Sequence, residues 1–357
     1  MIRAITTGCL AVFLLVSSAA AQSTLISVST RRDHIFDPTR NALYITTNNG
    51  LVQRYDLATN ALLTPWTVGT SLFGVDITPD ASALYAGDSV SGVLRKVALP
   101  SGTVSSLNYT LDSGETHSFD VAIGANGKGL ITTNFGGSGW VPIRELNTAT
   151  DTLTQRTDAP GSFGFNGEVR NRTMLNRSPD RNYILVTESD SSDGPMFGYN
   201  NISDTFTGNT SRGYSLTQVA SSVNRSRQII ALESGSDLHI LDPSFAFQRA
   251  LTGMDGGNIF SPTRDVLYAV SSSADQLVAF ETANFTELFR LNVGENVAAS
   301  SAFDAGVMSI SPSGDRLFLS TPAGVRMFVV PEPASLAMIA AAPLLLVRRR
   351  RLRRCHR

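Results

Sequence analysis

Short runs of alternating apolar and polar residues follow one another along most of this 357-residue chain. Examples are Leu43-Tyr44-Ile45-Thr46 and Val52-Gln53-Arg54-Tyr55, and clusters of Pro, Asn, Asp, Gly and Thr separate the runs. Alternation of this kind puts apolar side chains on one face of an extended strand, and the separating residue types favour tight turns. No segment of residues 22–330 shows a sustained helical period. The pattern therefore predicts an all-β body made of short antiparallel strands.

These runs recur in a fixed frame. A proline stands five residues before an apolar position in five places, which are Leu43, Leu84, Ile184, Leu267 and Leu317, and two further copies keep the spacing without proline. A second strand-like run trails each first one, as Val52–Asp56 does. Seven copies result, which begin near residues 34, 75, 121, 175, 220, 258 and 308.

A repeat of about 45 residues that holds four short strands is typical of a β-propeller blade. We therefore predict a propeller of seven four-stranded antiparallel blades over residues 22–330. The last copy ends at Val329 without a fourth strand, whereas Thr24–Val28 is strand-like and precedes the first copy. Because a closed ring has no open strand edges, we expect Thr24–Val28 to complete blade seven, and its loss to cost solubility and cooperativity first.

The repeat resembles that of the YVTN and lactonase-like propellers, in which Ser-Pro-Asp-Gly precedes Leu-Tyr-Val-Thr-Asn and Val-x-Val-Ile-Asp. Ser311-Pro312-Ser313-Gly314 and Leu43–Asn48 come nearest to these motifs. The resemblance covers almost all of residues 23–330 and is degenerate in copies three, four and five. It implies the propeller fold and, as one possible activity, hydrolysis of a sugar lactone.

The two ends of the chain have a different character. Residues 1–21 combine Arg3, an apolar run and the small residues Ala19 to Ala21, a pattern typical of a secretory signal helix that is cut after Ala21. At the other end, Pro331-Glu332-Pro333 precedes an apolar stretch over 334–347 and a cluster of arginines. We expect three parts: a signal peptide over 1–21, a propeller over 22–330 and a sorting segment over 331–357.

The C-terminal segment resembles the PEP-CTERM sorting signal. The resemblance implies transient membrane association through a hydrophobic helix over 334–347 and cleavage near Pro331 to Pro333 by an exosortase-type enzyme. A helix of this length rises about 21 Å, which is short of a hydrocarbon core of about 30 Å. Arginines that follow the apolar stretch favour a cytoplasmic tail, which would leave the body outside the cell. We therefore expect a secreted protein of the cell envelope or the extracellular matrix.

Composition excludes several kinds of chemistry. Both cysteines, Cys9 and Cys355, lie in the terminal segments, so the body has neither a disulfide nor a thiolate metal site. Without Arg3, Glu332 and the tail arginines, the body holds 21 basic and 29 acidic residues, a net charge near −8. A chain with this charge is a poor nucleic-acid binder, so we expect no nucleic-acid partner. We also expect a monomer.

The segments that lead into the innermost strand of each blade are where we expect a ligand. They contain ten polar candidates: Asp33, His34, Asp76, His117, Asp120, Glu168, Arg170, Gln218, Asn258 and Asp304. We select His34, His117, Arg170, Gln218 and Asn258 as the ligand-binding residues. His34 and His117 do not occupy equivalent repeat positions, so we expect neither a symmetric metal ring nor a cofactor.

Three further segments invite functional readings that we do not favour. Glu188–Gly194 is acidic but lacks the spacing of a calcium loop, and Gly136–Gly139 is not followed by the helix that a phosphate loop requires. We interpret them as a solvated loop and a long hairpin. The aromatic residues of the longest connections suit sugar stacking, but burial between blades is the commoner fate of such residues; they are Trp140, Phe163, Phe165 and Phe197.

Our leading hypothesis is a non-enzymatic binding module whose partner is exopolysaccharide or matrix protein. The alternative is a lactonase-like hydrolase with Glu168, Arg170 and His117 as catalytic candidates. A quinone-dependent or metal-assisted propeller dehydrogenase is disfavoured, because the body has three histidines and no cysteine.

Overall fold

The computed structural model describes residues 23–161, 167–188, 196–210 and 221–331. This part of the chain forms thirty β-strands and no helix, so it contains no helix that could cross a membrane. The signal helix expected over 1–21 and the hydrophobic helix expected over 334–347 lie outside the described residues. The all-β prediction for the body is confirmed.

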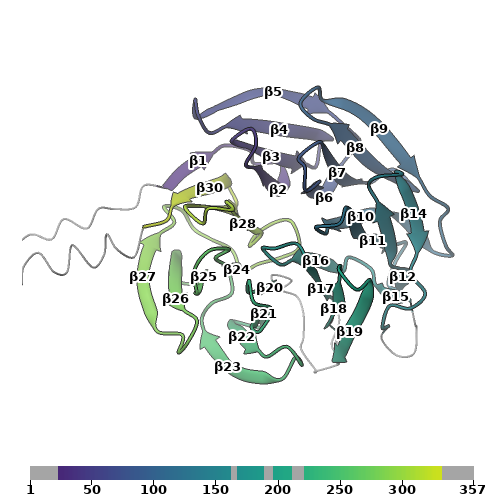
Figure 1. Cartoon of the computed structure of the whole chain (residues 1–357). Coiled ribbons are helices and arrows are strands. Elements are labelled where there is room, and N and C mark those ends of the chain that lie inside the picture. The colour runs from purple at the N-terminus through teal and green to yellow at the C-terminus, as the bar shows by residue number, and fades with distance from the viewer. Residues whose placement is uncertain (1–22, 162–166, 189–195, 211–220, 332–357) are drawn as a thin grey trace, which may run out of the picture.

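Seven four-stranded antiparallel sheets stand around a central axis as the blades of a propeller (Figure 1). Blades one to three comprise β2 to β5 (Arg31–Asp37, Ala42–Thr47, Leu51–Asp56, Ala61–Thr67), β6 to β9 (Leu72–Ile77, Ala83–Asp88, Val93–Ala98, Thr103–Asn108), and β10, β11, β13 and β14 (Glu115–Ile123, Lys128–Phe135, Arg144–Asn147, Thr152–Gln155). Blades four and five comprise β16 to β19 (Met174–Arg177, Tyr183–Thr187, Met196–Asn200, Thr205–Thr210) and β20 to β23 (Ser221–Val223, Ile230–Ser234, Asp237–Leu241, Phe247–Thr252). Blade six comprises β24 to β27 (Asn258–Phe260, Val266–Ser271, Gln276–Glu281, Glu287–Asn292), and blade seven comprises β28 to β30 (Met308–Ile310, Arg316–Thr321, Gly324–Val329) with β1 (Ser23–Ile26).

The N-terminal strand completes blade seven, as predicted. β1 pairs antiparallel with β30 in a register that runs from Ser23 opposite Phe328 to Ile26 opposite Val325. Ile26 and Val28 are buried in one apolar cluster with Leu43 of blade one. The two ends of the described body therefore meet in one sheet, and all seven sheets lie within Ser23–Pro331. We expect this segment to fold as a self-contained unit.

Burial follows the position of each strand within its blade. The second strands β3, β7 and β25 are buried at every residue, because both faces of each sheet pack on neighbouring blades. The first four residues of the outer strand β5 are exposed, and so is most of β23. Pro65 lies in β5, where the missing N–H makes this outer strand less able to pair with a strand of another molecule.

One small sheet interrupts the regular pattern between blades three and four. β12 (Trp140–Pro142) pairs with β15 (Glu168–Arg170) in a two-stranded sheet that belongs to no blade. Trp140 therefore lies in a strand, with the guanidinium carbon of Arg170 5.2 Å from the centre of its ring. Phe197, which we expected in a connection, lies in β18 and is fully buried. Phe163 and Phe165 lie outside the described residues.

Candidate functional site

A short loop closes one end of the central channel. This loop, Ser300–Val307, joins blade six to blade seven, and we call it the plug. The bridge between Ser301 and Ala305 folds it into a tight turn that carries Phe303. The ring of Phe303 lies 4.9 Å from that of Phe119 in blade three and 6.5 Å from that of Phe73 in blade two. Contacts with blades on the far side of the ring require the plug to cross the channel.

Polar contacts hold the plug to several other blades. From blade one, Arg31 donates a hydrogen bond to the carbonyl of Asp304, and Arg32 forms an ion pair with the carboxylate of Asp304 at 2.6 Å. The hydroxyl of Ser300 donates to the carboxylate of Glu233 at the end of β21 in blade five. Asp304 is thus a residue of the plug and does not line the channel wall.

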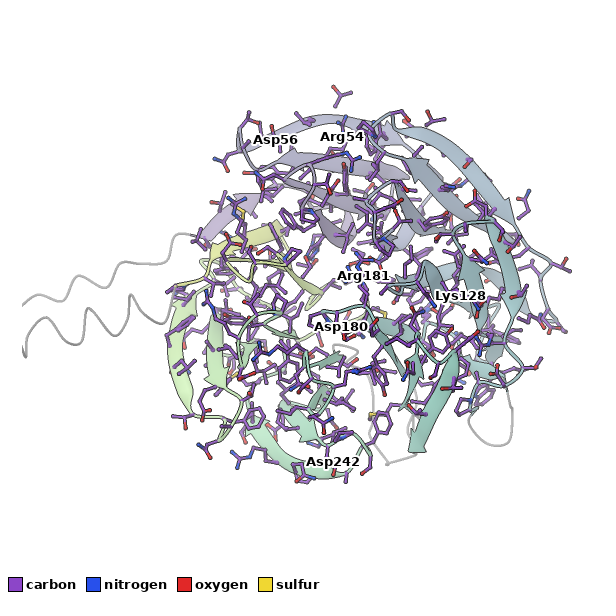
Figure 2. All side chains as sticks on the ribbon, in the orientation of Figure 1. Arg54, Asp56, Lys128, Asp180, Arg181 and Asp242 are labelled. Atoms are coloured by element: carbon purple, nitrogen blue, oxygen red, sulfur yellow. The ribbon has the colours of Figure 1, made fainter. Side chains whose placement is uncertain are left out.

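The channel forms a cavity of about 570 Å³ beyond the plug. Its lining includes the inner strands, the plug, and the turns that follow several inner strands, where Pro38, Pro79, Pro179, Pro262 and Pro312 lie. Because the plug closes the other end, these turns surround the mouth of the cavity. Figure 2 shows Asp180 and Arg181 of one such turn toward the middle of the ring, far from Asp56 and Asp242 at its outer edge.

Three aspartates of the inner strands cross-connect neighbouring blades. In each, one carboxylate oxygen accepts the N–H of the next residue, and the other accepts an N–H from the inner strand of the next blade. The second bonds are all 2.8 Å long and join Asp33 to Val75, Asp76 to Ile123, and Asp120 to Leu175. These carboxylates therefore stitch blades one to four together along the channel wall.

A glycine makes room for one of these carboxylates. Gly74 occupies in blade two the position that Asp33 and Asp120 hold in blades one and three. A Cβ on Gly74 would lie 2.0 Å from Oδ1 of Asp120, closer than any real contact.

Burial raises the pKa of Asp33 to about 7, against the opposing hydrogen bonds from the N–H groups of Val75 and His34. Burial, and then the charge of Asp33, raise the pKa of Asp120 well above its ordinary value.

Two arginines of blade four lie against Asp76 of blade two. Nε of Arg177 donates to Oδ2 of Asp76 at 2.8 Å, and Nη2 of Arg181 lies 3.9 Å from Oδ1. Nη1 of Arg181 donates to the carbonyl of Ile77 at 2.6 Å. Burial, and then the charge of Arg177, lower the pKa of Arg181 to about 10, so it stays protonated at neutral pH. Two guanidinium groups thus share one carboxylate here.

Arg181 occupies a left-handed backbone conformation that favours glycine. Its φ is 59°; the corresponding turn residues are Gly127 and Gly314 in blades three and seven, with φ of 78° and 75°, and Ala81 and Arg227 in blades two and five, with φ of 55° and 60°. A left-handed conformation costs a non-glycine residue roughly 1–2 kcal/mol. The turn therefore carries strain that places a charged side chain at the cavity mouth.

Only some of the residues that we selected on sequence grounds lie at the cavity. His34, Asn258, Asp33, Asp76 and Asp120 line the cavity, and Gln218 lies outside the described residues. Burial lowers the pKa of His34 to about 4, so it is neutral at physiological pH.

The three catalytic candidates do not line this cavity. His117 stacks on Phe73 at 5.2 Å between ring centres, while Glu168 and Arg170 belong to β15. Among the described residues, no hydrogen bond or ion pair joins any two of His117, Glu168 and Arg170. Arg170 instead donates from Nη2 to the hydroxyl of Ser138 at 2.8 Å.

The structure also bears on the expected loops. Within the described ranges, no three His, Cys, Asp or Glu side chains are grouped so as to hold a metal ion. Of the acidic run Glu188–Gly194, only Glu188 is described, and its carboxylate accepts the N–H of Arg170 at 3.1 Å. Sequence reasoning missed Arg177, Arg181 and Phe303. The one available signal was an arginine at 181, where the Ser-Pro-Asp-Gly turn has its glycine.

Glu233 should make stability depend on pH. Burial raises its folded-state pKa from 4.5 to about 8, against hydrogen bonds from Ser300 and from the N–H of Gly257. Folding then takes up a proton between these two values, so the free energy of unfolding should fall as pH rises from about 4.5 to about 8. Urea unfolding at pH 5 and pH 8 measures this effect. The free energy of unfolding should fall less between the two pH values for Glu233→Gln than for the wild type. Equal losses in the two proteins would contradict this role.

Comparison with known proteins supports the fold alone. No family model matches this chain, and no curated protein matches it. A solved chain of hydrazine synthase from Kuenenia stuttgartiensis superimposes with a TM-score of 0.65, over 86% of this chain and 98% of that one, at 12% identity. The fold and its plugged channel define the protein as a seven-bladed β-propeller with a cavity that is closed at one end.

Proposed function

We propose that this protein is an exported propeller of the cell envelope or extracellular matrix that binds a ligand in its central cavity and performs no chemistry of its own. The observation that carries the proposal is the cavity of about 570 Å³, a size typical of ligand sites, which the plug closes at one end. The terminal segments supply the proposed location: a leader over 1–21 and a sorting tail over 331–357 that an exosortase-type enzyme would cleave.

The position of the chain ends suits this role. Ser23 and Phe328 are paired in blade seven, and Arg264 donates a hydrogen bond to the carbonyl of Pro331 at 3.2 Å from the turn that follows β24. Pro262 of that same turn lines the cavity. Ser23 and Pro331, the two ends of the described body, therefore both lie at blade seven. Exopolysaccharide or a matrix protein is the partner that such a surface location favours.

The test has two arms. Fractionation of cells that produce the full chain should place it in the envelope or the medium, and replacing Pro331, Glu332 and Pro333 with alanine should leave it in the membrane fraction. A glycan array probed with residues 23–331 should show binding. Recovery of the unmodified chain in the cytoplasm would overturn the proposed location.

A lactone panel separates the proposal from the lactonase alternative. We expect no turnover by the wild type, because Glu168, Arg170 and His117 are not gathered at the cavity. Turnover that is lost in Glu168→Ala would establish the enzyme instead.

A further inference from the structure

Charged and aliphatic side chains both line the cavity wall. Blades two and four supply the charged groups Asp76, Arg177 and Arg181. The other blades supply polar groups such as His34 and Asn258, together with aliphatic side chains, which include Ile35, Val223, Ile259, Met308 and Ile310. All three residues of β28 remain partly exposed, which is the exposure expected of an apolar strand beside an open channel. A ligand that fills this space can lay an apolar part along these aliphatic side chains.

The charged side carries a surplus of hydrogen-bond donors. Among the described residues, Arg177 donates only from Nε, and its terminal nitrogens Nη1 and Nη2 have no partner there. Its side chain is 22% exposed. Both oxygens of the Asp76 carboxylate already accept hydrogen bonds, Oδ1 from the N–H of Ile77 and Oδ2 from the N–H of Ile123 and from Arg177. The pair of guanidinium groups therefore keeps unused donors and a net positive charge, which suit a carboxylate.

The remaining carboxyl groups do not reverse this polarity. Both oxygens of Asp33 and of Asp120 accept backbone N–H bonds, so these carboxyl groups are already engaged by the channel wall. Asp180 accepts hydrogen bonds from Ser178 and Asn182, and Arg225 pairs with Asp265 at 2.8 Å on the exposed rim. The free donors on this part of the wall therefore belong to Arg177, and they favour an anion there.

We infer that the cavity binds an amphipathic carboxylate, whose head group lies against Arg177 and Arg181 and whose aliphatic body lies along β24 and β28 toward the plug. The inference rests on the proposed binding function and names the ligand class for that site. One carboxylate matches the single surplus charge of the group formed by Arg177, Arg181 and Asp76, and a saturated chain matches the aliphatic side chains of β24 and β28.

Three probes with the same ten-carbon chain test the inference on residues 23–331. They are decanoate, decan-1-ol and decylammonium, which differ only in the charge of the head group. Calorimetric titration at neutral pH should give decanoate the tightest binding, decan-1-ol weaker binding and decylammonium none.

Two variants and one matched control locate the site. Arg177→Gln should weaken decanoate binding by at least about tenfold, which is the expected effect of losing a charged hydrogen bond. Arg181→Gly should weaken it similarly while folding at least as well as the wild type, because glycine relieves the left-handed strain at this turn. Arg225→Gln removes the same charge from the same rim, and it should bind within about twofold of the wild type because its guanidinium is engaged by Asp265.

The outcomes distinguish this inference from the broader proposal. Equal binding of decanoate and decan-1-ol, preference for decylammonium, or wild-type affinity in Arg181→Gly would overturn the carboxylate assignment. Absence of binding by all three probes together with a positive glycan array would also overturn it and would leave the proposed function standing. If neither the three probes nor the glycan array gave any binding, both the carboxylate inference and the proposed binding function would be contradicted.

Discussion

A protein that lacks residues 23–28 is expected to be largely insoluble and to unfold without a single cooperative transition. The deletion removes β1, so β30 loses its hydrogen-bonding partner and blade seven keeps three strands with an open edge. It also removes Ile26 and Val28, which pack with Leu43 and Phe318 between blades seven and one. Full burial of side chains of this size contributes roughly 1.5–3 kcal/mol each, against a total stability of about 5–15 kcal/mol.

Soluble yield and urea unfolding of residues 29–331, compared with residues 23–331, measure this effect. Thr24→Ala is the control, because Thr24 is exposed in the same strand and should leave both quantities unchanged. A deletion protein with the wild-type midpoint and slope would show that β1 does not close the ring.

Replacing Phe303 with alanine should destabilise the protein by about 3–5 kcal/mol, the range for deleting a buried aromatic side chain. Phe303 is 2% exposed and packs with Phe73, Phe119 and Met174 from three consecutive blades. Its loss leaves a void that these blades cannot fill by a local shift, since their backbones are fixed by the bonds of Asp33, Asp76 and Asp120.

Urea unfolding provides the measurement, and Phe247→Ala provides the control. Phe247 is 49% exposed in the outer strand β23, so its truncation should cost much less. Equal losses in the two variants would mean that the plug does not pack across the channel.

The blades could be predicted from the sequence because each copy repeats the same physical constraints. A turn that favours proline, followed by alternating apolar residues, specifies two paired strands wherever it recurs. Closure could also be predicted, because a last copy without a fourth strand and a spare strand before the first copy complete one another. Both features depend on short segments whose local preferences agree with the global fold.

The site could be predicted only in part. Asp33 and Asp120 occupy equivalent repeat positions, and their place on the channel wall follows from the register of β2 and β10. Phe303 could not be predicted as a plug, since it lies in a connection without periodicity and its partners come from three other blades. The sequence predicts Glu168 and Arg170 at the channel because they precede β16, whereas in the structure they pair with β12 in a separate small sheet.

Closure of the ring is the central claim, and a cysteine pair across the seam tests it most directly. Thr24 and Met327 are paired in β1 and β30, and residues 23–331 contain no natural cysteine. Side chains directly opposite in an antiparallel pair have Cβ atoms about 4.5–5.5 Å apart, which is near disulfide geometry. Mild oxidation of Thr24→Cys/Met327→Cys should give an intramolecular disulfide in most molecules, whereas Thr24→Cys/Thr152→Cys, with its second cysteine in blade three, should keep free thiols. Free thiols in the first variant, or disulfides formed only between molecules, would contradict a ring that its own N-terminal strand closes.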